Sequence, residues 1–360
     1  MQRLVVCCDG TWNTPDQKDR GVMRPSNVVK IARYVLPQDP GGIEQHVYYD
    51  KGVGTGDLVD RVFGGAFGVG LAHNVLQAYE FLSLNYRAGD EIYLFGFSRG
   101  AYTARRVVGM MRKAGLLPPM ADATARTAAI RDAYAMYLKR ETRAQGGADA
   151  PAALAFRERH GAARVPVRFL GVWDTVGAYG IAGVMGQLTT AASTARFHDR
   201  ILSSDVRHAC HAVAIDEHRR LFEPTLFQQG ANGAANGQVI EQSWFAGVHA
   251  NIGGGYEDTG LSDIALQWMA ARAEGCGLAL DQGWRGKIAP DEFGELRDSQ
   301  TGIYALLGKA VRPIGEQAGG FERMHHTPVE RMERDPAGYA PANAAAYLKS
   351  PQREVDLSEP

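Results

Sequence analysis

Cysteine is scarce in this sequence, with only four residues, Cys7, Cys8, Cys210 and Cys276, in a chain of 360. They are too few and too scattered for a disulfide framework, and no two have the C-x-x-C spacing of a metal or redox site. In a strand, the neighbours Cys7 and Cys8 would point to opposite faces. We therefore expect four free thiols in a reducing compartment.

Excess charge and long apolar runs are also lacking. The formal net charge is -1, with 39 Lys and Arg against 40 Asp and Glu, so nucleic acid is not an expected partner. No apolar run approaches the roughly 18 residues of a membrane span. The N-terminal sequence MQRLVVCCDG has too short an apolar stretch for a signal peptide. These features predict a cytoplasmic location, or export by a secretion system that needs no cleaved signal.

What the sequence does contain is an alternation of apolar runs and amphipathic segments. We predict strands at Arg3–Cys8, Gln45–Asp50, Glu91–Phe97, Val165–Trp173 and Val239–Val248. We predict helices at Ser26–Leu36, Leu71–Arg87, Ala101–Gly115 and Leu261–Ala273. Strands that are apolar along their whole length are typical of a parallel sheet covered on both faces by helices. The predicted fold class is α/β with a mostly parallel central sheet.

We expect residues 1–332 to form a single domain. Within it, residues 118–163 are rich in Ala and Arg and have a helical pattern, which predicts an inserted helical cap or lid. Residues 333–360 are rich in Ala, Pro and charge, which predicts a loosely ordered C-terminal tail. The glycine-rich apolar stretch Val62–Ala72 has two interpretations: a buried loop, or a surface that touches a membrane interface or lines an acyl pocket.

One short motif stands between a predicted strand and a predicted helix. The sequence Gly96-Phe97-Ser98-Arg99-Gly100 fits G-x-S-x-G, the nucleophile elbow, in which a sharp turn lifts a serine above the edge of the sheet. Gly96 and Gly100 leave room where a Cβ would clash. The alternative is a tight turn in which Ser98 only caps the helix.

Four predicted strands are followed by polar residues whose side chains can take part in catalysis, namely Asp9, Ser98, Asp174 and His249. The carboxyl ends of parallel strands share one edge, where ligands bind. The chain order Ser98, Asp174, His249 matches that of an α/β-hydrolase triad. A turn aspartate and a loop histidine are the plain alternatives. Asp258 and Asp263 lie closer to His249 in sequence and compete with Asp174 as its partner.

The loop after the first strand and the start of the helix after Ser98 could supply an oxyanion hole. Backbone N–H groups of Gly10 and Thr11 could join that of Arg99 around a developing negative charge. We expect Asp9 to hold this loop by hydrogen bonds. We expect the Asp263 carboxylate to stabilise the first turn of its helix through the helix dipole. A metal at Asp258 and Asp263 is conceivable, but carboxylates there more often order a loop. No metal or organic cofactor is expected.

Several blocks together resemble a known family: CCDGTWN, GFSRGAYTAR, GVWDTVGA, RHACHAVAIDEHR and WFAGVHANIGGGY, followed by GLSDIALQWM. They are similar to an α/β-hydrolase family whose best understood members are type VI secretion phospholipase effectors. The resemblance covers roughly Arg3–Ala273. It implies an α/β-hydrolase catalytic domain, a triad of Ser98, Asp174 and His249, and hydrolysis of ester bonds in phospholipids.

The sequence thus predicts a serine hydrolase that cleaves carboxylic esters, with a lipid or other acyl ester as substrate and a peripheral contact with a membrane as an option. One alternative is a hydrolase-fold module that binds a membrane or a protein with little catalysis. The other keeps the enzyme but changes the substrate to a thioester or a small ester.

Overall fold

A computed structural model describes residues 1–10, 13–52, 67–139, 147–177, 201–317 and 321–358. Thr11 and residues 62–66 of the glycine-rich stretch lie outside these ranges. The described cysteines are all buried and free, as expected. None of the described helices is both long and apolar enough to cross a membrane.

The centre of the molecule is an eight-stranded sheet in which every neighbouring pair is parallel. In spatial order the strands are β10 (Val355–Asp356), β9 (Glu322–His325), β8 (Val239–Phe245), β7 (Val206–Ala214), β6 (Val167–Trp173), β5 (Glu91–Phe97), β1 (Arg3–Cys8) and β4 (Gln45–Asp50). A separate antiparallel pair joins β2 (Lys18–Asp19) to β3 (Val22–Met23). The α/β fold class with a mostly parallel sheet is confirmed.

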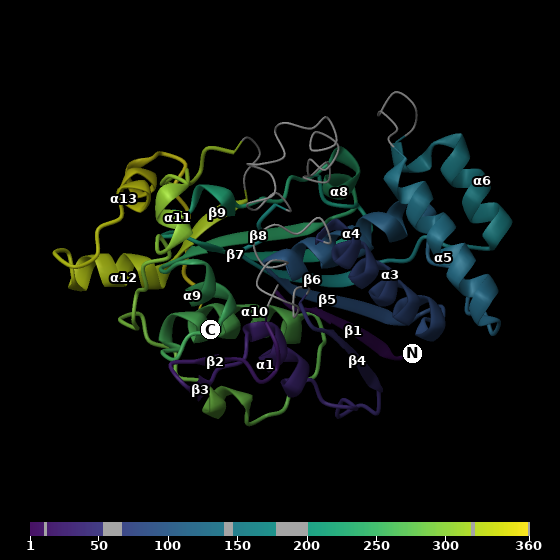
Figure 1. Ribbon diagram of the computed structural model, residues 1–360, viewed down its shortest axis with the longest axis horizontal. Coiled ribbons are helices and arrows are strands. Elements are labelled where there is room, and N and C mark those ends of the chain that lie inside the picture. Colours follow the sequence, from purple (N-terminus) through teal and green to yellow (C-terminus); the bar gives the residue numbers. More distant parts are fainter. Residues whose placement is uncertain (11–12, 53–66, 140–146, 178–200, 318–320, 359–360) are drawn as a thin grey trace.

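Helices cover both faces of this sheet (Figure 1). The helices of the described residues are α1 (Asn27–Tyr34), α3 (Phe67–Asn85), α4 (Arg99–Ala114), α5 (Ala123–Leu138), α6 (Pro151–His160), α8 (Ala231–Ala235), α9 (His249–Gly253), α10 (Gly260–Gly275), α11 (Ile303–Leu306), α12 (His326–Arg334) and α13 (Ala342–Lys349). Short 3₁₀ turns are η2 (Gly147–Asp149), η5 (Arg220–Phe222) and η6 (Trp284–Lys287).

Two apolar cores follow from the alternation of side chains along the strands. In β1, Leu4 and Val6 pack into the core beneath α3 and α4, whereas Val5 and Cys7 pack into the core beneath α1 and α10. Every residue of β1 is buried, as a central parallel strand requires. The rigid sheet between these cores is what fixes the positions of the residues at its carboxyl edge.

The insertion between residues 118 and 163 contains α5 and α6. Its two ends meet at an isolated bridge between Leu116 and Ala163, next to the end of α4 and the start of β6, at the amino edge of the sheet. In Figure 1, α5 and α6 lie to the right of α4, far from α9. The described helices of the insertion thus form an outer layer on α3 and α4, and they do not cover the carboxyl edge as a lid would.

The expectation of a loosely ordered tail after residue 332 is wrong. Helix α13 buries Tyr347, and β10 adds the outermost strand to the sheet. The Asp356 carboxylate accepts hydrogen bonds from Ser243 Oγ at 2.7 Å and from Trp268 Nε1 at 2.8 Å. Composition misled here because a two-residue strand is fixed by its buried partners and not by its own apolar pattern.

Candidate active site

Ser98 occupies the sharp corner between β5 and α4. Its backbone has φ 56° and ψ -120°, an uncommon and strained conformation for a residue with a Cβ. The Ser98 side chain makes no capping hydrogen bond to α4. The corner therefore has the form of a nucleophile elbow, and the alternative of a capping serine is not what the structure shows.

The two glycines of the motif are required by close packing at this corner. A Cβ on Gly100 would lie 2.1 Å from the Cys8 carbonyl oxygen, and one on Gly96 would lie 2.6 Å from the Gly100 carbonyl oxygen. Neither position tolerates a side chain without movement of the backbone. The first turn of α4 is thereby packed against the end of β1, and the Ser98 amide donates to the Trp173 carbonyl on β6 at 3.0 Å.

Asp174 and His249 meet at the same edge of the sheet. Asp174 follows β6 and is completely buried, and its φ of 38° marks a second strained turn. His249 begins α9, and its Nδ1 lies 2.5 Å from Asp174 Oδ2. The His249 ring packs between Phe97, at 4.7 Å, and Phe222, at 5.0 Å, measured between ring centroids. This pairing leaves Nε2 as the ring nitrogen that is available to a substrate or nucleophile.

The charges of this pair suit a histidine base. Burial alone would raise the pKa of Asp174, but Arg312 and His249 hold it well below its usual range, so the carboxylate stays ionised. Burial lowers the pKa of His249 below its usual value, and Asp174 opposes this only in part. At neutral pH the imidazole is therefore neutral and able to accept a proton.

Arg312 is the principal residue that the sequence analysis missed. It is 4% exposed and clasps the Asp174 carboxylate, with Nη1 2.6 Å from Oδ1 and Nη2 3.1 Å from Oδ2. The same guanidinium donates to the carbonyls of Ala214 and Phe222, at 2.9 and 2.5 Å. A bidentate arginine fixes the plane of a carboxylate as well as its charge. No motif marks Arg312, which lies 138 residues from Asp174.

Glu217 is a second residue that the sequence analysis did not identify. It is fully buried, and its Oε2 accepts the backbone N–H of His249 at 3.2 Å. Arg219 and Ser299 also donate to it. Burial alone would raise the pKa of Glu217, but Arg219 lowers it to about 2. Glu217 thus holds the first turn of α9, and with it the position of the His249 ring.

Asp9 anchors the loop after β1, as expected. Its carboxylate accepts from Ser26 Oγ at 2.7 Å, from Tyr49 Oη at 2.8 Å and from Asn13 Nδ2 at 3.1 Å. It also accepts the Gly10 N–H at 2.7 Å. The expectation that Gly10 donates to an oxyanion is therefore corrected, because the buried Asp9 carboxylate takes that hydrogen. The corresponding expectation for Thr11 falls outside the described residues.

The two competing aspartates have other partners. Asp263, in the first turn of α10, lies 2.5 Å from Lys30 Nζ and also accepts from Thr259 Oγ1 at 2.7 Å. Asp258 accepts the backbone N–H groups of Gly260 and Glu295. Asp263 therefore ties α10 to α1, and Asp258 orders a loop, so it is Asp174 that His249 contacts.

One group among the described residues has donors suited to a metal ion: His208, Cys210 and Glu241. His208 Nε2 and Glu241 Oε1 are 2.6 Å apart, and Arg272 Nε donates to Glu241 Oε2 at 3.0 Å. The sequence did not predict this group because Glu241 lies on the neighbouring strand, far from His208 and Cys210 along the chain. The existing hydrogen bonds and ion pairs account for this group, which lies towards the amino ends of β7 and β8.

The sequence matches a known protein family over most of its length. The family described as "T6SS, Phospholipase effector Tle1-like, catalytic domain" matches residues 2–272. The chain belongs to this Tle1-like family. The expected family is therefore confirmed, and the family's description names the catalytic domain of a phospholipase effector.

The individual proteins that resemble this Tle1-like chain have low sequence identity to it. An uncharacterized protein of Saccharomyces cerevisiae is 27% identical over 249 residues, which are 63% of this chain and 33% of the relative. A crystal structure of an uncharacterized protein from Pseudomonas aeruginosa has a TM-score of 0.49 and 17% identity, and the match covers 81% of this chain and 49% of that one. The Tle1 effector bound to the VgrG spike has a TM-score of 0.39 and 18% identity, with 72% and 52% covered. The chain thus spans a third to a half of these proteins.

Proposed function

We propose that this Tle1-like chain hydrolyses carboxylic ester bonds of phospholipids through an acyl-enzyme on Ser98. The observation that carries the mechanism is the contact between His249 Nδ1 and the buried Asp174 carboxylate, at the sheet edge where the strained Ser98 corner lies. The lipid substrate is inferred from the family, whose members are phospholipase effectors. Export by the type VI route is part of the same proposal.

In the first step, the Ser98 hydroxyl attacks the ester carbonyl while His249 Nε2 takes the hydroxyl proton. The Asp174 carboxylate holds the Nδ1–H tautomer and stabilises the imidazolium that forms. His249 then returns the proton to the departing alcohol, which leaves the acyl group on Ser98. Water, activated by the same imidazole, attacks this second ester and releases the fatty acid. Proton transfer of this kind contributes about 10² to 10⁴ in rate.

The tetrahedral oxyanion needs donors that are in place before the reaction. We assign the backbone N–H of Arg99 to this role because it begins α4, where the helix dipole favours negative charge. The prediction that the Thr11 N–H supplies a second donor stays part of this proposal. One such donor contributes about 10² to 10³ in kcat in other acyl-transfer enzymes.

The test compares the wild type with Ser98→Ala on p-nitrophenyl esters of increasing chain length and on phosphatidylcholine and phosphatidylethanolamine vesicles. Ser203→Ala, which removes another buried serine hydroxyl, is the matched control. We expect fatty acid release from vesicles that Ser98→Ala abolishes and Ser203→Ala preserves. Activity on short esters alone would overturn the phospholipid substrate, and equal activity of the wild type and Ser98→Ala would overturn the mechanism.

A further inference from the structure

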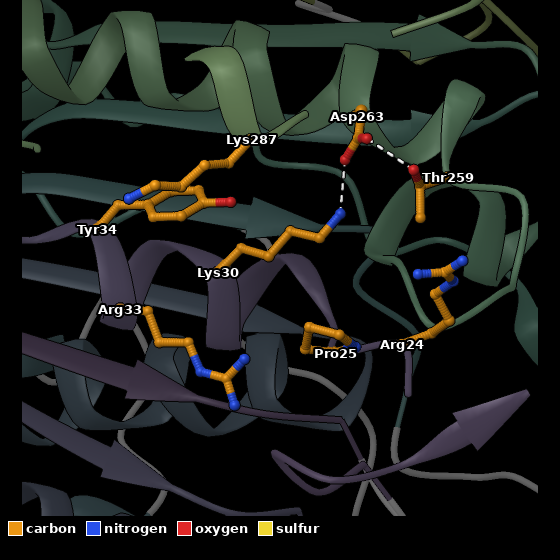
Figure 2. A pocket seen from close by; sticks show the side chains of 8 residues that line it. All are labelled: Arg24, Pro25, Lys30, Arg33, Tyr34, Thr259, Asp263 and Lys287. Atoms are coloured by element: carbon orange, nitrogen blue, oxygen red, sulfur yellow. Dashed lines mark hydrogen bonds and ion pairs between the residues drawn. The ribbon is translucent and has the colours of Figure 1, made fainter. Parts of the chain in front are cut away.

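A basic pocket lies on the α1 and α10 side of the sheet, separate from the Ser98 corner. It has a volume of about 410 Å³ and is lined by Arg24, Pro25, Lys30, Arg33, Tyr34, Thr259, Asp263 and Lys287. Figure 2 shows that these side chains come from α1 and the residues before it, from the start of α10 and from η6. Four cationic side chains thus surround one carboxylate.

The single carboxylate of this basic pocket already has three hydrogen-bond donors within the protein. Asp263 accepts from Lys30 Nζ at 2.5 Å, from Thr259 Oγ1 at 2.7 Å and from the Ala289 N–H at 3.0 Å. Its charge is therefore matched by Lys30. Lys287 is paired with Asp281, which lies outside the lining. The two arginines remain as the surplus positive charge.

Neither arginine has a carboxylate partner among the described residues. Arg24 Nε is buried and makes no hydrogen bond within the described part of the chain. Arg33 Nη2 donates to the Pro15 carbonyl at 3.1 Å, which leaves its charge uncompensated. The Arg24 side chain lines the pocket, and no carboxylate of the described residues competes there for its guanidinium charge, so an anionic ligand is the partner that this arginine lacks.

We propose that the basic pocket binds a phosphate ester. A phosphate monoester carries about 1.5 to 2 negative charges at pH 7, which matches the surplus of two arginines. The planar fork of a guanidinium pairs with phosphate oxygens through two parallel hydrogen bonds. Tyr34 and Pro25 supply apolar walls for the carbon skeleton of the ester. The recognised group can belong to an anionic lipid head group or to a small soluble phosphate ester.

The basic pocket is connected to the rim of the candidate active site. Ser26, two residues after Arg24, donates through Oγ to Asp9 and bridges to Gly254 in the loop after α9. A phosphate held by Arg24 would therefore lie on a segment that is fixed to both the Asp9 loop and the His249 helix.

The test measures binding to the full chain carrying Ser98→Ala, in which the proposed hydrolysis of vesicle lipids is removed. Inorganic phosphate and glycerol 3-phosphate contain no carboxylic ester, so their binding is independent of the proposed enzymatic mechanism. Calorimetry would follow inorganic phosphate and glycerol 3-phosphate, and co-sedimentation would follow phosphatidylcholine vesicles with and without phosphatidic acid. The double variant Arg24→Gln/Arg33→Gln is compared with Arg159→Gln/Arg207→Gln, which removes two exposed arginines elsewhere. Melting curves check folding, and Arg33→Gln alone, at an exposed position, serves if the double variant is unstable.

We expect Arg24→Gln/Arg33→Gln to weaken binding about 10- to 100-fold, as loss of charged hydrogen bonds does, and the control to bind like the parent. Binding of soluble phosphates alone, or of phosphatidic acid vesicles alone, supports the proposal and identifies the source of the phosphate. Absence of binding to every probe would overturn it. So would equal binding by the parent and the double variant.

Discussion

Two buried aspartates, Asp174 and Asp263, share two kinds of contact and differ in a third. Asp174 and Asp263 are each in contact with a cationic side chain, Arg312 and Lys30 respectively. Each also accepts a backbone N–H. Only Asp174 contacts an imidazole, at 2.5 Å. Burial and an ion pair therefore do not distinguish the carboxylate that we propose to be catalytic, whereas its contact with an imidazole does.

The two aspartates have different partners because they lie at different positions in the fold. Asp174 comes directly after a central strand, so it lies at the carboxyl edge, in register with the Ser98 corner on β5. Asp263 lies in the first turn of α10, where its carboxylate ties that helix to α1. The four predictions that follow test this contrast, in order of decreasing effect on activity.

Asp174→Asn should lower kcat by about 10⁴, because an amide favours the wrong imidazole tautomer. The measurement is steady-state hydrolysis of the best ester substrate. A loss of less than tenfold would show that Asp174 is structural only, whatever its distance from His249.

Arg312→Gln should lower kcat by about 10², since a displacement of Asp174 and His249 by even 1 Å can have an effect of this size. It should also move the acid limb of the pH–rate profile to higher pH, because removal of a nearby cation favours the imidazolium. Arg312→Lys, which keeps the charge, should return the acid limb close to its wild-type position but should recover kcat less completely. An unchanged pH profile would mean that Arg312 acts only on stability.

The pH dependence of kcat/KM in the wild type tests the protonation state of His249 directly, without a substitution. The proposed mechanism requires the base form of His249, and burial lowers the pKa of this residue below the usual 6.5. As pH falls, kcat/KM should therefore reach half of its plateau value at a pH below 6.5. A midpoint above 6.5 would contradict the neutral, buried imidazole that the structure shows.

Asp263→Asn should change kcat by less than about threefold and yet lower the free energy of unfolding. Removal of one partner from a buried ion pair costs about 3 to 5 kcal/mol, and the amide retains part of the hydrogen bonding, so a loss of about 2 to 3 kcal/mol is expected. Denaturant unfolding measures it. A large loss of kcat in a folded Asp263→Asn protein would erase the contrast between the two aspartates.

The sequence was sufficient to predict the parts of the site that end strands. Apolar runs that stop at Ser98 and Asp174 predict their positions, because side chains that follow parallel strands share one edge. Strand β7 was not predicted, since Arg207, His208 and His211 interrupt its apolar run. The structure explains this: His208 pairs with Glu241, and His211 Nε2 accepts the Thr175 N–H at 3.0 Å.

Other parts could not be predicted for a related reason. Arg312 lies in an irregular segment, and its partners come from distant parts of the chain, so no local pattern points to it. The hydrogen bond that withdraws the Gly10 N–H depends on how the Asp9 side chain is buried. The paired ends of the insertion depend on the bridge between Leu116 and Ala163. These features come from tertiary contacts and not from the spacing of residues.

The most direct measurement is labelling by a fluorophosphonate probe with peptide mapping, in the wild type and in His249→Ala. We expect a label on Ser98 in the wild type and labelling slower by several orders of magnitude in His249→Ala, because the nucleophile then lacks its base. A label on another residue, or equal labelling rates in the two proteins, would contradict the assignment of Ser98 and His249 as nucleophile and base.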